Sequence, residues 1–234
     1  MGVVKHHGET HHNPKVALRD VVIGLSDGLT VPFALAAGVS VAVASSKVVV
    51  TAGLAEIVAG SISMGLGGYL AARTDIDQYA SERRREYREV QLVPHIERDE
   101  VRDVFREYGL GGSELEQVVD HIVADPDRWV DFMMRFELGL EEPEIHRARE
   151  SAITIALSYI VGGLIPLSPY MLLGDRLHAL AASVITTLFA LMAFGAVKGR
   201  ATGAGILRSG LQTLAIGGLA AGAAYLLALL FHVQ

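Results

Sequence analysis

Two long apolar blocks, residues 21–72 and 151–232, restrict the folds that this chain can adopt. The first block carries only three charged side chains and the second only five. A hydrocarbon core about 30 Å thick is crossed by roughly 20 helical residues. Five apolar segments reach that length, at about residues 21–44, 48–72, 151–172, 177–197 and 204–232. We therefore predict an all-α polytopic membrane protein whose five transmembrane helices lie in a lipid bilayer.

The segment between the two blocks has the opposite character. Residues 75–150 hold 21 of the 26 acidic residues but only 11 of the 20 basic ones, so their net charge is near −10. Such a segment repels nucleic acid and attracts cations. The chain has no cysteine, which excludes thiolate metal sites. The domains that we predict are an N-terminal tail (1–19), spans one and two (20–74), a helical soluble domain (75–150) and spans three to five (151–234).

Helix breakers divide the soluble domain into helices. Because neither glycine nor proline interrupts residues 75–92, we expect the second span to continue through them as one helix. Further helices are expected at about 95–108 and 127–140, each opened by a proline. A helix between these two should start at Ser113, which forms a capping box with Glu116. The domain is thus predicted to be a small helical bundle.

Basic residues are distributed unevenly around the spans. Five spans place the two termini on opposite sides, with the N-terminus and the 75–150 domain on the same side. By the positive-inside rule, that side is cytosolic and the C-terminus is lumenal or external. The basic residues flanking spans on the domain side are Lys15, Arg19, Arg73, Arg147, Arg149, Lys198, Arg200 and Arg208, against Lys47 and Arg176 on the other side.

Paired carboxylates recur on the predicted helices of the soluble domain. Glutamates three residues apart share one helix face, and a turn at Pro94 can bring two such pairs together. Carboxylates bind hard cations, and a nearby thioether favours a softer transition-metal ion. The alternative is a solvated charged face with the methionines in the core. The candidate ligands are Glu86, Glu89, Glu97, Glu100, Met133, Met134 and Glu137, and one of the two adjacent methionines should point elsewhere.

Two further carboxylates, Asp27 and Glu56, lie inside predicted spans. A charge at the bilayer centre costs roughly 2.5–3.5 kcal/mol on insertion scales, so such residues usually face a pathway. Pro32 can loosen the helix around Asp27 and free carbonyl groups for an ion. Met64 follows Glu56 by eight residues and lies on a similar side of the helix. The alternative is that a protonated Asp27 or Glu56 makes an interhelical hydrogen bond.

These motifs resemble the vacuolar iron transporter family, which includes the yeast-type vacuolar iron and manganese carriers. The resemblance runs from about Pro14 to the last span. It rests on the paired glutamates, on the insert between spans two and three, and on three motifs: GLSDGLTVP at 24–32, EIVAGSISMGLGGY at 56–69 and ERRRE at 82–86.

The resemblance implies a homodimeric carrier in the vacuolar membrane that moves Fe²⁺ from the cytosol into the vacuole by proton antiport. Such a protein is not an enzyme and has no prosthetic group. Mn²⁺, Zn²⁺ and Co²⁺ are further candidate substrates, since the same ligands serve them. The resemblance further implies that the soluble domain collects the metal at the seven candidate ligands, and that Asp27, Glu56 and Met64 form the route through the membrane.

Two other functions are weighed against transport. A non-transporting membrane metal sensor or scaffold would also need a cation site in the soluble domain. An intramembrane hydrolase is suggested by Ser26 beside Asp27, but no predicted span holds a histidine at depth. The N-terminal histidines can bind metal, but a polar tail of this kind is expected to be disordered; they are His6, His7, His11 and His12.

Overall fold

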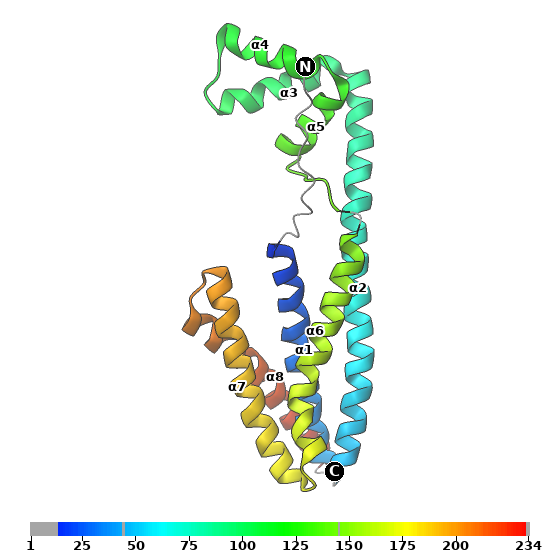
Figure 1. The fold of residues 1–234 in the computed structure, drawn as a ribbon, viewed down its shortest axis with the longest axis vertical. Coiled ribbons are helices and arrows are strands. Elements are labelled where there is room, and N and C mark those ends of the chain that lie inside the picture. The colour runs from blue at the N-terminus through cyan, green and yellow to red at the C-terminus, as the bar shows by residue number, and fades with distance from the viewer. Residues whose placement is uncertain (1–13, 44, 145, 233–234) are drawn as a thin grey trace. The chain divides into compact units, whose positions relative to one another are not determined.

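The computed structural model describes residues 14–43, 45–144 and 146–232, and within these residues the chain is all-α, with eight helices and no strand (Figure 1). The N-terminal histidines lie outside the described residues. Five helices, α1, α2, α6, α7 and α8, are long and apolar enough to cross a membrane, which confirms the predicted fold class. The helices are α1 (Pro14–Ala42), α2 (Ser46–Leu92), α3 (Pro94–Glu107), α4 (Gly112–Val123), α5 (Pro126–Phe136), α6 (Arg147–Leu172), α7 (Arg176–Thr202) and α8 (Ile206–His232).

Helix α2 is a single helix of 47 residues. The prediction that the second span continues to residue 92 is therefore confirmed. It ends where it does because Pro94 disfavours the helical conformation of the residue before it, and Val93 is non-helical, with ψ at 48°.

The chain forms two compact units. The first, the membrane unit, contains the described residues up to Tyr69 and those from Arg149 onward. The second, the glutamate-rich unit, spans Leu70–Ala148 and contains the C-terminal part of α2 together with α3, α4 and α5.

Within the membrane unit, α6 packs against α1 backbone to backbone. A Cβ atom on Gly24 would collide with the carbonyl oxygen of Ile155, and one on Gly28 would lie 2.8 Å from the Cα atom of Tyr159. From the other side, a Cβ atom on Gly162 would lie 3.0 Å from the carbonyl carbon of Gly28. Only glycine permits this separation, as in other closely packed membrane helices. We refer to these contacts as the α1–α6 glycine seam.

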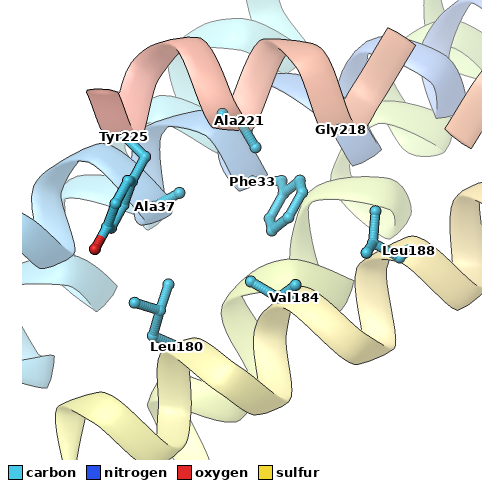
Figure 2. A pocket seen from close by; sticks show the side chains of 9 residues that line it. Phe33, Ala37, Leu180, Val184, Leu188, Gly218, Ala221 and Tyr225 are labelled. Carbon is cyan, nitrogen blue, oxygen red and sulfur yellow. The ribbon is translucent and has the colours of Figure 1, made fainter. Parts of the chain in front are cut away.

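Helices α1, α7 and α8 surround an apolar cavity of about 370 Å³ (Figure 2). None of the described residues that line it is charged, and its one side-chain polar atom is the hydroxyl of Tyr225. Because metal cations are held by carboxylate, imidazole, thioether or other polar ligands, and Tyr225 is the one polar side chain among the described residues of this lining, we do not expect an ion to be held in this cavity. It is lined by Phe33, Ala37, Leu180, Val184, Leu188, Gly218, Ala221, Gly222 and Tyr225.

The glutamate-rich unit has its own apolar core, to which α2, α3, α4 and α5 all contribute. Phe105 stacks on Phe132 with ring centroids 5.3 Å apart. The predicted capping box is wrong, because α4 begins at Gly112 without a side-chain cap. Glu116 instead accepts a hydrogen bond from Arg102 Nε at 2.7 Å, and a bond between two charged groups is stronger than a capping bond to a neutral amide.

Candidate functional site

Three carboxylates converge in the glutamate-rich unit: Glu86 on α2, Glu97 on α3 and Glu137 at the C-terminal cap of α5. One oxygen from each lies within 4.8 Å of the other two. Glu86 and Glu97 are 1% and 4% exposed, whereas Glu137 is exposed. The Oε2 atoms of Glu86 and Glu97 are buried and have no hydrogen-bond partner among the described residues. Unpaired buried oxygens are costly, so this glutamate cluster would be stabilised by a cation or by protons.

Burial and mutual repulsion act on the protonation of this cluster. Loss of solvent is the largest cause, and repulsion between carboxylates adds to it, so that the pKa of Glu86 and that of Glu97 are raised to about 7. The same causes raise the pKa of Glu137. The charges of Glu89 and Glu100 contribute to these shifts. The structure therefore brings all five predicted glutamates within electrostatic range of one another.

Both candidate methionines lie in the apolar core of the same unit. Met133 is 0% and Met134 1% exposed, so the two do not differ in burial. The backbone amide of Glu137 donates to the carbonyl of Met133 at 3.1 Å, which places this glutamate one turn further along the chain.

Metal affinity should depend steeply on pH. The pKa values near 7 in the folded unit exceed the ordinary glutamate value of 4.5, so between these pH values the folded, metal-free unit holds protons that the unfolded chain has lost. The stability contributed by these two groups is therefore present below about pH 4.5 and is lost as pH rises through 7. A metal must displace those protons, so we expect Mn²⁺ affinity of the full chain to fall at least about tenfold from pH 8 to pH 6. Electron paramagnetic resonance of free Mn²⁺ measures this, and equal affinity at both pH values would contradict it.

In the membrane unit, Asp27 of α1 and Glu56 of α2 lie around one phenol, that of Tyr159 on α6. The Tyr159 hydroxyl donates a hydrogen bond to Glu56 Oε1, and the charge of Asp27 also acts on this phenol. The Glu56 Oε2 atom is buried without a partner among the described residues. Gly60 leaves room for the hydroxyl, since a Cβ atom there would collide with it. The interhelical hydrogen bond considered for Glu56 is thus present, but it satisfies only one of its two oxygens.

Sequence reasoning missed Tyr159. Its signal was a tyrosine placed eight residues into the predicted third span, where a buried phenol needs a hydrogen-bond partner. The side chain is 2% exposed. Its partner is Glu56, one of the two carboxylates predicted inside the spans.

The helix around Asp27 continues through Pro32, where a carbonyl group is freed without a break in the helix. Residues 14–42 form one α-helix with Pro32 inside it. Proline has no N–H, so the carbonyl of Gly28 receives no hydrogen bond from residue 32. Asp27 is half-buried and has no hydrogen bond or ion pair among the described residues. Met64 is half-buried, about two turns beyond Glu56 on α2.

Tyr159→Phe should lower stability by about 1 kcal/mol, the usual size of one interhelical hydrogen bond in a membrane protein, and should also slow metal flux. Tyr170→Phe is a matched control, because this buried tyrosine lies on the same helix and bonds Ser40 Oγ at 2.7 Å, away from the carboxylates. Thermal unfolding in detergent and flux into proteoliposomes are the measurements. If both variants slow flux equally, Tyr159 acts only through stability.

Comparison with known proteins decides the family. The model of the VIT family matches residues 18–229, a range that contains both candidate sites. The chain belongs to the VIT family. Vacuolar iron transporter 1 of Arabidopsis thaliana is 53% identical over 226 residues, which is 97% of this chain and 90% of that protein. Vacuolar iron transporter 1 of Oryza sativa subsp. japonica is 54% identical over 220 residues, covering 94% and 87%.

The family also extends to more distant members. Protein CCC1 of Saccharomyces cerevisiae is 39% identical over 221 residues, covering 91% of this chain and 68% of that protein. The resemblance inferred from the sequence motifs is therefore confirmed for this family.

Proposed function

We propose that this protein carries Fe²⁺ from the cytosol across the vacuolar membrane in exchange for protons. The observation that carries the proposal is the pair of membrane carboxylates, Asp27 and Glu56, with one unpartnered oxygen on Glu56 and no hydrogen bond to Asp27 among the described residues. Carboxylates left unsatisfied at such a depth are expensive unless a cation or proton passes them. The names of the relatives from Arabidopsis and rice support iron as the substrate.

The proton exchange follows from ligand chemistry. A carboxylate must be deprotonated to hold a metal ion. On the acidic side of the membrane, protons displace the metal from Asp27 and Glu56, and loss of those protons toward the cytosol restores the site. Met64 adds a thioether, which favours transition metals over Ca²⁺ and Mg²⁺. Mn²⁺, Zn²⁺ and Co²⁺ are further candidate substrates on the same chemistry.

The glutamate-rich unit is, in this proposal, a cytosolic domain that collects the metal. The two orphaned oxygens of Glu86 and Glu97 support this role. The basic residues that flank the spans support a cytosolic position for this unit and the N-terminus and a lumenal position for the C-terminus. The homodimer is proposed from family resemblance. The candidate collecting ligands are Glu86, Glu89, Glu97, Glu100, Glu137 and one of the two adjacent methionines, Met133 or Met134.

Purified protein in liposomes tests the proposal. With Fe²⁺ kept reduced outside and an acidic interior, we expect metal uptake that stops when the pH gradient is collapsed, and a rise of internal pH when metal is added. Metal uptake at the same rate with and without the pH gradient would exclude proton exchange. Intact Mn²⁺ binding without any flux would favour the alternative, a non-transporting metal sensor or scaffold.

A further inference from the structure

Arg85 on α2 lies among three carboxylates. Its guanidinium nitrogens are 2.8 Å from Glu82 Oε2, 3.3 Å from Glu89 Oε2 and 3.6 Å from Glu86 Oε1. Two of these three partners, Glu86 and Glu89, belong to the proposed collecting site, and Glu82 does not. The Arg85 side chain is 44% exposed, so it can move without opening the core.

The neighbouring arginines have other environments. Arg83 pairs with Asp131 at 2.9 Å, away from the glutamate cluster. Arg84 is exposed and makes no ion pair among the described residues. Of three consecutive arginines, Arg85 is thus the one whose charge lies against the cluster.

A guanidinium and a divalent cation compete for the same carboxylates, because both use carboxylate lone pairs and both are positively charged. The guanidinium has only donors, so it cannot coordinate a metal, and its positive charge repels one. A metal that binds Glu86 Oε1 and Glu89 Oε2, the two oxygens that Arg85 contacts, would displace two of the three contacts of Arg85. The shortest contact, to Glu82, can remain, because Glu82 is one turn away from Glu86 and outside the ligand set.

We propose that Arg85 is a tethered competing cation, which occupies part of the glutamate cluster when no metal is bound and withdraws onto Glu82 when metal binds. This inference rests on the proposed collecting role of the cluster. The presence of the Arg85 guanidinium weakens metal binding to the cluster. A site that must pass its metal onward benefits from weaker binding, because slow release would limit transport.

The test is Mn²⁺ binding to the full-length protein in detergent at pH 8, where most of the carboxylates are ionised. Mn²⁺ binds histidine weakly compared with later transition metals, which limits interference from the N-terminal histidines. We expect Arg85→Gln to bind Mn²⁺ about tenfold more tightly than wild type, because one positive charge is removed a few ångströms from the ion. The matched control, Arg84→Gln, makes the same change of net charge and should leave the affinity within about twofold.

If Arg85 had a purely structural role, Arg85→Gln would weaken Mn²⁺ binding instead of tightening it. Arg85→Gln should lower the melting temperature of the metal-free protein and enlarge the rise produced by Mn²⁺. Weaker or unchanged Mn²⁺ binding, or equal tightening by Arg84→Gln, overturns the inference. Should Arg85→Gln not fold, Arg85→Lys keeps the charge but loses the planar fork; its affinity should rise less than tenfold, and weaker binding than wild type overturns the inference.

The collecting role itself is checked by Glu97→Gln, since Glu97 does not touch Arg85. If wild-type protein binds no Mn²⁺, or binds it regardless of Glu97→Gln, the collecting site and the inference both fall. If Glu97→Gln loses binding but Arg85→Gln does not tighten it, only the role of Arg85 falls.

Discussion

Replacing Asp27 with asparagine should reduce Fe²⁺ flux about 100-fold or more. Changes to groups that merely support a metal ligand already cost about 10- to 100-fold, and a direct ligand should cost at least as much. Asparagine keeps the shape of the side chain and removes its charge, so a cation loses an anionic partner inside the membrane. Initial rates of uptake into proteoliposomes measure the effect.

The control for this variant is Asp175→Asn. Asp175 is also an acidic residue of the membrane unit, but it caps α7 by accepting a hydrogen bond from the His178 amide at 2.9 Å, and asparagine is an equally good cap. This control should transport at nearly the wild-type rate. Asp27 has no hydrogen bond among the described residues to lose, so the melting temperature of Asp27→Asn should not fall. Flux equal to that of the control would exclude Asp27 from the route.

Glu86→Gln and Glu97→Gln should each lower Mn²⁺ affinity about 10- to 100-fold and, at the same time, stabilise the metal-free protein. The two effects have opposite signs for one reason. Each buried carboxylate that attracts the metal also has one oxygen, Oε2, that lacks a hydrogen-bond partner among the described residues when the metal is absent. Because the pKa of each carboxyl is near 7, the gain in stability should be larger at pH 8 than at pH 6.

Titration with Mn²⁺ and thermal unfolding, both at pH 8 and pH 6, check this pair of effects. Glu114→Gln is the comparison, since Glu114 is exposed in the first turn of α4 and outside the cluster. It should change neither quantity. Lower stability together with lower affinity would mean that Glu86 and Glu97 hold the fold rather than a cation.

The helices could be predicted from local features of the sequence. Apolar length identifies the five spans, and the absence of a breaker between residues 75 and 92 predicts the long α2, because both depend on neighbouring residues alone. The predicted capping box of Ser113 and Glu116 is wrong because it depends on a residue that is distant in the sequence. Arg102, on another helix, binds Glu116, and a local motif contains no information about a competing partner from elsewhere in the chain.

The candidate sites could be predicted only in part. The glutamates were found from their spacing along single helices, but the meeting of Glu97 with Glu137 depends on how α3 and α5 pack around α2. Burial, which raises the pKa of these groups, arises from that packing as well. Tyr159 was missed because its role comes from its contact with Glu56, a residue 103 positions earlier in the chain.

The α1–α6 glycine seam limits how a carrier of this kind can change shape. Where backbone lies against backbone, no side chain can change rotamer to absorb a displacement, so sliding or rolling of one helix on the other would break the contact outright. We therefore expect the two helices to move together, which would keep Asp27 and Tyr159 at a fixed separation. If the protein transports an ion as proposed, we expect the helix movements to occur at contacts made by flexible side chains, such as those around the apolar cavity between α1, α7 and α8.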